Sequence, residues 1–291
     1  MLRDRYRPIV QTDWSGEPAD ALIALHARRS AESIARFHEQ SNGRRIAVVL
    51  TGTDLYKDLP ESREAAASLD AADRVVVLQD DALRLLAAKW RRKAEVIFQS
   101  APLLAKRAKP RGRLDVVVVG HLRAEKDPRT LFEAMRHIPR GLPIRIRHIG
   151  APLDAVLGDL ARTLEREDPR YRYSGALSHG LARAAMQRAH VLVHPSVVEG
   201  GANVIVEAIT AGTPVIASRI SGNVGMLGRD YPGFFEPRDA QGLAKRLVHA
   251  LEDPRELSCL RCACDQRKRL FRPQAEAAAI RALAAGLVAR R

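Results

Sequence analysis

The sequence predicts an α/β fold with two parallel, doubly wound sheets. Apolar runs of strand length alternate with helix-length segments along most of the 291 residues, a length sufficient for two domains of ordinary size. Hydrophobic residues make up 46% of the chain but aromatic residues only 4%, so Ala, Val, Leu and Ile supply most of the apolar surface. This mixture is typical of buried parallel strands covered by Ala-rich helices.

The first half contains short strands with helices between them. Strands are expected at Arg7–Gln11, Ala21–Leu25, Ile46–Leu50, Arg74–Leu78 and Glu95–Phe98. Helices are expected at Ser30–Gln40, Arg63–Leu69 and Asp81–Trp90, with Asp80 or Asp81 as the N-cap of the last one. A doubly wound domain normally opens with a strand, a Gly-rich turn and a helix, whereas Met1–Arg7 resembles the end of a helix. We therefore expect a Rossmann-like domain that lacks its first strand and helix.

The second half repeats the alternation after a basic, aperiodic stretch, residues 103–113, which we interpret as a linker because it carries Pro110 and Gly112. Strands are expected at Leu114–Gly120, Ile144–Ile149, Tyr171–Tyr173, Val191–His194 and Pro214–Ala217. Helices are expected at Asp127–Ile138, Leu153–Arg166, Leu181–Arg188, Ala202–Ala211, Ala240–Leu251 and Arg272–Arg291. We predict domains at residues 1–105 and 106–271, and a final helix at 272–291 that crosses back to the first domain.

Composition and charge argue against nucleic-acid binding, a membrane span, secretion and a zinc site. The formal charge is +14, but the basic residues are spread along the chain and do not interleave with aromatic residues as a stacking platform requires, so no nucleic-acid partner is expected. A positive cleft that attracts anionic substrates fits better. No apolar run approaches about 18 residues and no signal peptide is evident, so neither a membrane span nor secretion is expected. Cys259, Cys262 and Cys264 have no fourth ligand at matching spacing, which favours reduced thiols in a cytoplasmic protein over zinc.

The strongest motif runs from His194 to Asn203 and on to Glu207, where a predicted strand ends at two glycines and a helix begins. Free amides at a helix start can bind a diphosphate. Glu199 lies in the loop, where it can reach a sugar. Glu207 follows eight residues later, about one and a half turns into the helix, where it can accept hydrogen bonds from ribose hydroxyls.

These residues resemble the Glu-x7-Glu segment of retaining glycosyltransferases with two Rossmann-like domains, the GT-B architecture. The stretch from Gly120 through Lys126 to Pro128 resembles the same family's Gly-Arg-Leu-x-x-Glu-Lys-Gly turn, and the resemblance spans Leu114 to about Asp253. It implies that Lys126 contacts the donor diphosphate. The family's usual Arg is His121 here, so either Arg123 supplies the missing charge or His121 binds phosphate itself.

The resemblance implies sugar transfer with retention from a UDP-sugar, in which the enzyme acts mainly by electrostatics and positioning. The segment Ser174–Leu177 resembles the loop that holds the base. The implied catalytic residues are Lys126, Arg123, Glu199 and His121; the implied donor-binding residues are Gly120, Gly175, Leu177, Gly200, Gly201, Ala202, Asn203 and Glu207. No Asp-x-Asp pair occurs, so no catalytic metal and no cofactor are expected, and the UDP-sugar is a substrate.

Two further motifs follow predicted strand ends in the first half, where ligands bind in such folds. They are His26-Ala-Arg28-Arg29-Ser30 and Thr51-Gly52-Thr53-Asp54. Two arginines suit a small anionic acceptor; the alternative is that they are solvated surface residues at a helix start. The predicted acceptor-binding residues are Arg28, Arg29, Thr51, Thr53 and Asp54.

Together, the four motifs resemble the selenosugar synthases of selenoneine biosynthesis, over most of the chain from about Asp20 onward. This resemblance implies selenophosphate as acceptor, UDP-N-acetylglucosamine or UDP-glucose as donor, and a carbon–selenium bond in the product. The alternatives are an ordinary retaining O-glycosyltransferase acting on a hydroxyl, a nucleotide-sugar epimerase of similar fold, and a non-catalytic nucleic-acid-binding protein.

Overall fold

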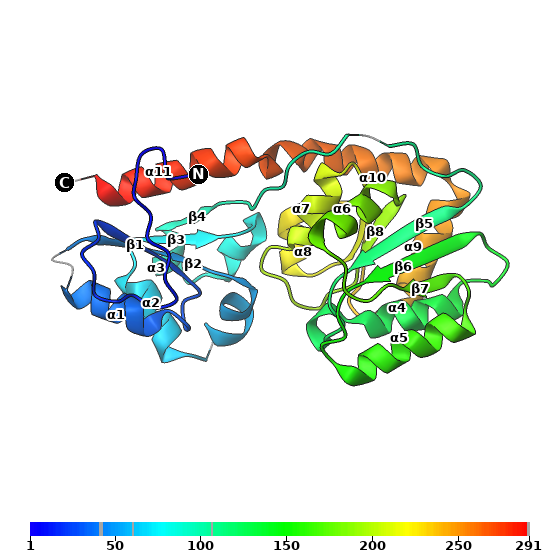
Figure 1. The fold of residues 1–291 in the computed structure, drawn as a ribbon, viewed down its shortest axis with the longest axis horizontal. Helices are drawn as coiled ribbons and strands as arrows, with labels where there is room; N and C mark the ends of the chain where they lie inside the picture. Colours follow the sequence, from blue (N-terminus) through cyan, green and yellow to red (C-terminus); the bar gives the residue numbers. More distant parts are fainter. Residues whose placement is uncertain (41–42, 60, 106, 290–291) are drawn as a thin grey trace. The chain divides into compact units, whose positions relative to one another are not determined.

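The computed structural model describes residues 1–40, 43–59, 61–105 and 107–289, which form two compact units (Figure 1). Unit 1 contains Met1–Ser100 and Pro273–Arg291, and unit 2 contains Ala101–Arg272. Each unit is built on a parallel sheet with helices packed against it, which confirms the predicted α/β class. The last two residues of the predicted final helix lie outside the described residues.

The sheet of unit 1 has the order β1-β2-β3-β4, with all strands parallel. The strands are β1 (Ala21–Leu25), β2 (Arg45–Val49), β3 (Arg74–Val77) and β4 (Ala94–Val96). The prediction of a strand at Arg7–Gln11 is wrong, because these residues have no regular structure and Val10 is 93% exposed. Pro8 lacks the amide that a strand ladder needs, and only two apolar residues follow it.

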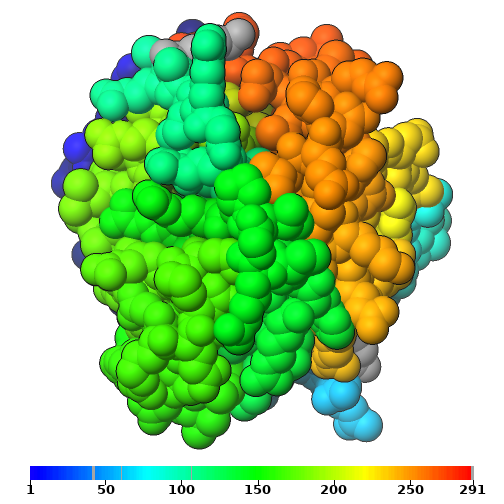
Figure 2. Space-filling model, turned by 90° about the vertical axis from the view of Figure 1, so that its right-hand side faces the viewer, coloured from blue at the N-terminus to red at the C-terminus, as the bar shows by residue number. Residues whose placement is uncertain are grey.

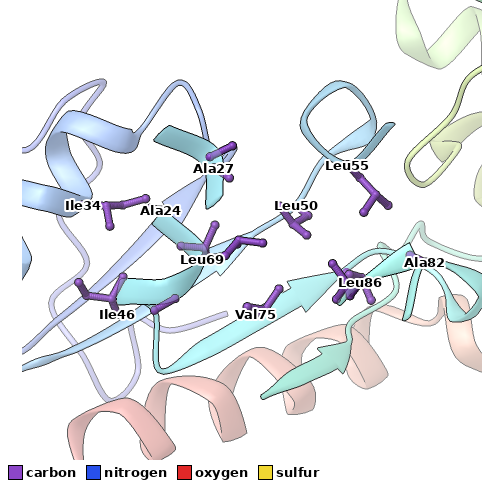
Figure 3. Packing of buried hydrophobic residues seen from close by; sticks show 14 of the residues in the cluster. Ala24, Ala27, Ile34, Ile46, Leu50, Leu55, Leu69, Val75, Ala82 and Leu86 are labelled. Carbon is purple, nitrogen blue, oxygen red and sulfur yellow. The ribbon is translucent and has the colours of Figure 1, made fainter. Parts of the chain in front are cut away.

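Helices cover both faces of this sheet. One face packs against α1 (Ala31–Gln40) and α2 (Arg63–Ala71) through a core that includes Ile34, Leu69 and Val75 (Figure 3). The other face packs against α11 (Pro273–Val288), whose Leu283 and Leu287 join Ala47, Val76 and Ile97 in a second cluster. The C-terminal helix therefore belongs to the same unit as the first strand.

The described residues of unit 1 also form three short helical segments, namely η1 (Asp54–Asp58), η2 (Asp80–Leu85) and α3 (Ala88–Arg91). The predicted single helix Asp81–Trp90 is wrong, since extended backbone at Leu86 divides it into η2 and α3. The predicted cap at Asp80 or Asp81 is also wrong. The fully buried side chain of Gln79 accepts from the amides of Asp81 and Ala82 instead.

The sheet of unit 2 has the order β10-β9-β8-β5-β6-β7 and is also parallel. Its strands are β5 (Leu114–Val119), β6 (Ile144–Ile149), β7 (Tyr171–Tyr173), β8 (Val191–His194), β9 (Val215–Ser218) and β10 (Phe234–Phe235). The chain starts at β5, builds outward to β7, and then returns to place β8 on the other side of β5. Such a reversal of strand order opens a crevice at the carboxyl ends of the two central strands, where ligands bind in this class of fold.

The helices of unit 2 lie on both sides of its sheet, with α4 and α5 on one side and α6 and α7 on the other (Figure 1). Their bounds are η3 (Ala124–Lys126), α4 (Pro128–His137), α5 (Ala155–Glu167), α6 (His179–Arg188), α7 (Asn203–Thr210), α8 (Ser221–Leu227), α9 (Ala240–Glu252), α10 (Pro254–Arg267) and η4 (Lys268–Phe271). In Figure 2 the orange segment that contains α9 and α10 lies against the green segment that contains α4 and α5, and α4 contacts α9 directly. Helices α8 and α10 and strand β10 lie where no element was predicted.

The segment interpreted as a linker belongs to unit 2 and is fixed to α6. The Arg183 and Gln187 side chains donate to the carbonyls of Pro102 and Ala105. Lys109 in turn donates to the carbonyl of Gln187. Side chains of a regular helix therefore satisfy carbonyls of a segment in which residues 101–105 and 107–113 form no strand or helix.

Candidate active site

Two loops meet at the carboxyl ends of the adjacent strands β5 and β8. Residues 120–127 follow β5 and residues 195–202 follow β8. The Val197 amide donates to the Glu125 carbonyl over 2.9 Å, which joins the loops. Beside this bond, the Lys126 ammonium lies 2.5 Å from the Glu199 carboxylate. Two motifs that are 73 residues apart in sequence thus share one site.

The Lys126–Glu199 pair is largely buried, with the lysine side chain 20% exposed and the glutamate side chain 11% exposed. The His194 ring, at the end of β8, lies 3.1 Å from the same carboxylate. Burial by itself would raise the pKa of Glu199, but the His194 ring and the Lys126 ammonium outweigh it and hold that pKa well below its usual range. Burial lowers the pKa of His194, which Glu199 offsets only in part. Near pH 7 Glu199 is therefore a carboxylate and His194 a neutral imidazole.

Helix α7 begins directly after this loop. Its cap residue, Ala202, has no side chain that can accept from the amides of the first turn, so these amides remain suited to an anionic ligand. The predicted donor-binding residues Gly200, Gly201, Ala202 and Asn203 form this turn. The loop is tightly packed from behind: a methyl group on Gly222 of α8 would lie 2.0 Å from the Glu199 carbonyl oxygen.

Glu207, the fifth residue of α7, does not join the Lys126–Glu199 pair. Its carboxylate is 2.7 Å from Nε2 of His179, the first residue of α6, and the histidine is 71% exposed. Gly175, in the loop predicted to hold the base, has a φ of 62°, a left-handed conformation that favours glycine. Leu177 follows it in the same loop and is half-buried.

His121 has a defined ring orientation although it is exposed. Its Nδ1 accepts a hydrogen bond of 3.0 Å from the Ala151 amide. The neutral ring must then carry its proton on Nε2, which gives His121 one N–H to donate to a ligand. Arg123 is exposed two residues later. Both residues that could replace the family's arginine are therefore accessible on this turn.

A polar layer lies beneath the Gly120–Lys126 turn. The fully buried His148 ring hydrogen-bonds the Gly120 backbone, and its Nδ1 shares a hydrogen bond of 2.8 Å with the Tyr171 hydroxyl. Burial lowers the pKa of His148 to about 4. A methyl group on Gly150 would lie 1.9 Å from the Gly120 carbonyl, so only glycine allows this approach.

The predicted acceptor residues lie at the carboxyl ends of β1 and β2 in unit 1. Arg28, Arg29 and Thr53 are exposed and Thr51 is half-buried, as a ligand-facing rim requires. Asp54 requires a correction, because it is fully buried. Its carboxylate accepts from the amides of Ala27, Thr51 and Leu55 and from the Thr51 hydroxyl. Asp54 therefore ties the two loops together and cannot face a ligand.

Sequence reasoning missed several residues that shape these sites. His194 opens the strongest motif, but its sequence position alone does not show that it contacts Glu199. No sequence signal marks His148, His179 or Gly150, because their importance depends on which loops become neighbours. Within the described residues, no group of three or more His, Cys, Asp and Glu side chains is placed to hold a metal ion. In the same part of the chain, no helix combines the length and apolar character needed to cross a bilayer.

Comparisons with known proteins converge on one group of enzymes. The family described as "Glycosyl transferases group 1" matches residues 101–269, more than half of the chain. The glycogen synthase of Mycobacterium tuberculosis is 32% identical over 157 residues, 53% of this chain and 37% of that protein. The glycosyltransferase 1 domain-containing protein 1 of Xenopus tropicalis is 28% identical over 232 residues, 71% of this chain and 67% of that protein. The chain thus spans little more than a third of the glycogen synthase.

Solved structures share the fold at low identity. Sucrose-phosphate synthase from Thermosynechococcus elongatus superposes with a TM-score of 0.74 at 23% identity, over 92% of this chain and 73% of that one. Anabaena HepE in complex with UDP and glucose gives a TM-score of 0.71 at 16% identity, over 92% and 78%. The pneumococcal O-GlcNAc transferase GtfA in complex with UDP and GlcNAc gives 0.71 at 16% identity, over 87% and 55%. These likenesses confirm the predicted GT-B fold.

Proposed function

This chain belongs to the group 1 family of glycosyl transferases, and from that premise we propose that it transfers a sugar from a UDP-sugar to a small oxyanion, selenophosphate. The proposed donor is UDP-N-acetylglucosamine or UDP-glucose. One observation carries the donor half of the proposal: the Lys126–Glu199 pair lies at the carboxyl ends of β5 and β8, beside the uncapped start of α7.

The donor diphosphate fits between Lys126 and the first amides of α7. Binding there replaces Glu199 by phosphate oxygens as the partner of Lys126 and leaves the Glu199 carboxylate free to accept from sugar hydroxyls. Glu207 would exchange His179 for the ribose hydroxyls in the same way. Charged hydrogen bonds of this kind contribute about 1.5–3 kcal/mol each.

The chemical step needs stabilisation of a leaving group more than a strong base. A lone pair on the acceptor selenium attacks the anomeric carbon, the bond from that carbon to the UDP oxygen breaks, and its electron pair remains on the diphosphate. The Lys126 ammonium and the α7 amides oppose this developing charge, together with the Nε2–H of His121. Arg123 adds a second positive charge on the same turn.

The choice of a uridine donor is supported by the two structural neighbours that contain UDP, HepE and GtfA, the second of which also holds GlcNAc. The choice of an oxyanion acceptor rests on the exposed Arg28 and Arg29 at the rim of unit 1 and on the resemblance of the four motifs to selenosugar synthases. Guanidinium groups favour compact multivalent anions.

The test is to incubate the full chain with UDP-N-acetylglucosamine and selenophosphate and to search for a selenium-containing sugar by mass spectrometry. Arg28→Ala and Arg29→Ala should abolish this product and leave UDP affinity unchanged in calorimetry. A glycosylated hydroxyl acceptor with no selenosugar would refute the oxyanion and favour an O-glycosyltransferase. Conversion of the UDP-sugar to its epimer without any acceptor would point to an epimerase.

A further inference from the structure

His26 has an unusual backbone conformation for its position. It follows β1 directly, has a φ of 75°, and is only 6% exposed. A non-glycine residue in the left-handed region carries a conformational cost, which the surroundings must offset. The ring contacts of His26 explain why this residue is held there.

The two ring nitrogens have different partners. Nδ1 accepts a hydrogen bond of 3.3 Å from the Arg29 amide. Since Nδ1 accepts, the ring proton sits on Nε2, which lies 3.1 Å from the Thr53 hydroxyl oxygen. His26 thus donates to Thr53 and connects the loop after β1 to the loop after β2.

This donation gives the two threonines of the second loop opposite roles. The Thr51 hydroxyl donates to the buried Asp54 carboxylate, so its hydrogen is already used. The Thr53 oxygen instead receives the His26 proton, which leaves the Thr53 hydrogen free to donate outward. Thr53 is exposed, so that donor is available to a ligand.

Asp58 extends the same arrangement to an arginine. Its carboxylate oxygen Oδ2 lies 3.5 Å from His26 Nε2 and 3.2 Å from Nε of Arg28. That oxygen is buried and accepts no hydrogen bond of good geometry. It contacts Arg28 at Nε, so the terminal nitrogens of the guanidinium, whose side chain is 51% exposed, can still face a ligand.

We propose that His26 is the positioning residue of an oxyanion-binding rim, in which it orients the Thr53 hydroxyl as a donor beside Arg28 and Arg29. The inference rests on the proposed function, because it concerns the same acceptor. It adds that the Thr53 hydroxyl presents a hydrogen-bond donor beside the two guanidinium groups, an arrangement that favours a compact oxyanion.

The probe is orthophosphate, whose binding to the full chain is followed by the ³¹P line width in the presence of saturating UDP, which fills the diphosphate subsite. His26→Asn keeps an oxygen that can accept from the Arg29 amide and tolerates the left-handed backbone, but it has no donor placed for Thr53. His26→Asn and Thr53→Val should each weaken phosphate binding about three- to tenfold. Thr53→Ser restores the hydroxyl and should bind within about twofold of the wild type.

Ser30→Ala is the matched control, since the Ser30 hydroxyl lies in the same loop but donates to the Leu25 carbonyl. It should leave phosphate affinity unchanged. The double variant His26→Asn/Thr53→Val should bind no more weakly than Thr53→Val alone, because both changes remove one and the same donor. A merely structural role for His26 predicts additive losses instead.

The outcomes separate the two proposals. Wild-type affinity in Thr53→Val, or additive losses in the double variant, overturns the role of His26 and leaves the anionic acceptor standing. Absence of phosphate binding in the wild type overturns both the oxyanion-binding rim and the anionic acceptor, while normal UDP binding in the same sample would keep the donor half of the proposed function.

Discussion

Removing Lys126 alone from the Lys126–Glu199 pair should destabilise unit 2 more than removing both partners. Lys126→Met leaves a carboxylate that is 11% exposed, with a neutral imidazole as its remaining neighbour. Breaking a buried ion pair in this way costs roughly 3–5 kcal/mol. Lys126 is 20% exposed, so water reaches part of the site and we expect about 3 kcal/mol, the low end of that range.

The reciprocal and double variants complete the cycle. Glu199→Gln leaves an ammonium on a flexible stem that can turn toward solvent, so its cost should be about 1 kcal/mol. The double variant Lys126→Met/Glu199→Gln should lie within about 1 kcal/mol of the wild type, which gives a coupling energy of about 3 kcal/mol. Because the pair lowers the pKa of Glu199, this stability is present above about pH 4.3, the value of an unfolded glutamate, and is lost as the pH falls below it.

The assay must report on unit 2. Both tryptophans, Trp14 and Trp90, lie in unit 1, so their fluorescence reports the unfolding of unit 1. Hydrogen exchange of peptides from β5 and β8 in increasing urea reports the unfolding of unit 2. Single-variant losses that simply add in the double variant would refute the pairing.

UDP affinity provides the functional control. Lys126→Met, alone or in the double variant, should weaken UDP binding at least tenfold, which corresponds to the loss of one charged hydrogen bond of about 1.5–3 kcal/mol. Glu199→Gln should not weaken it, because it frees Lys126 for the diphosphate. Weaker UDP binding in Glu199→Gln than in Lys126→Met would contradict the assignment.

Three further predictions follow from the same structure. Glu207→Ala should weaken UDP binding by about 1.5–3 kcal/mol, because ribose hydroxyls lose a charged acceptor; unchanged affinity in calorimetry would remove this role. Transferase activity should survive EDTA, since Lys126 and the α7 amides can oppose the leaving charge; loss on chelation that magnesium or manganese restores would contradict this expectation. Buried His148 is neutral in the folded chain with a pKa of about 4 against an ordinary 6.5, so acid should destabilise unit 2 as the pH falls from 6.5 to 4, by about 3 kcal/mol in total. In urea unfolding, His148→Gln should reduce the pH dependence of the free energy of unfolding, whereas His137→Gln, at an exposed histidine, should not. An unchanged pH dependence in His148→Gln would show that other groups cause the acid destabilisation.

The local pattern of apolar residues was sufficient to predict most strands and helices. Inner strands are buried on both faces, so they appear in the sequence as continuous apolar runs. The inner strands β2, β3, β5 and β8 are short runs rich in Val, Ile and Leu, and they form where the sequence predicts them. The failures share a cause. Arg7–Gln11 contains apolar residues, but no neighbouring element buries them. Strand β10 has only two residues, too few to give a pattern. The N-cap of η2 is a buried glutamine, which is not among the residues that N-cap preferences favour.

The sequence by itself determined the chemistry that each motif can offer. Two glycines before a helix, a lysine in a turn after a strand, and glutamates at fixed spacing predict a diphosphate and sugar site, since these properties depend on residues close together in the chain. It also identified Arg28 and Arg29 as basic residues after a strand.

Only the tertiary structure decided which of these groups meet. Lys126 pairs with Glu199 because strand order places β8 next to β5, and Glu207 pairs with His179 because α6 and α7 are neighbours. The same holds for Thr51 and Thr53 in the loop after β2, which the sequence treats alike. The direction of a hydroxyl hydrogen depends on the partner that the fold brings to it, and that partner is His26 for Thr53 and Asp54 for Thr51.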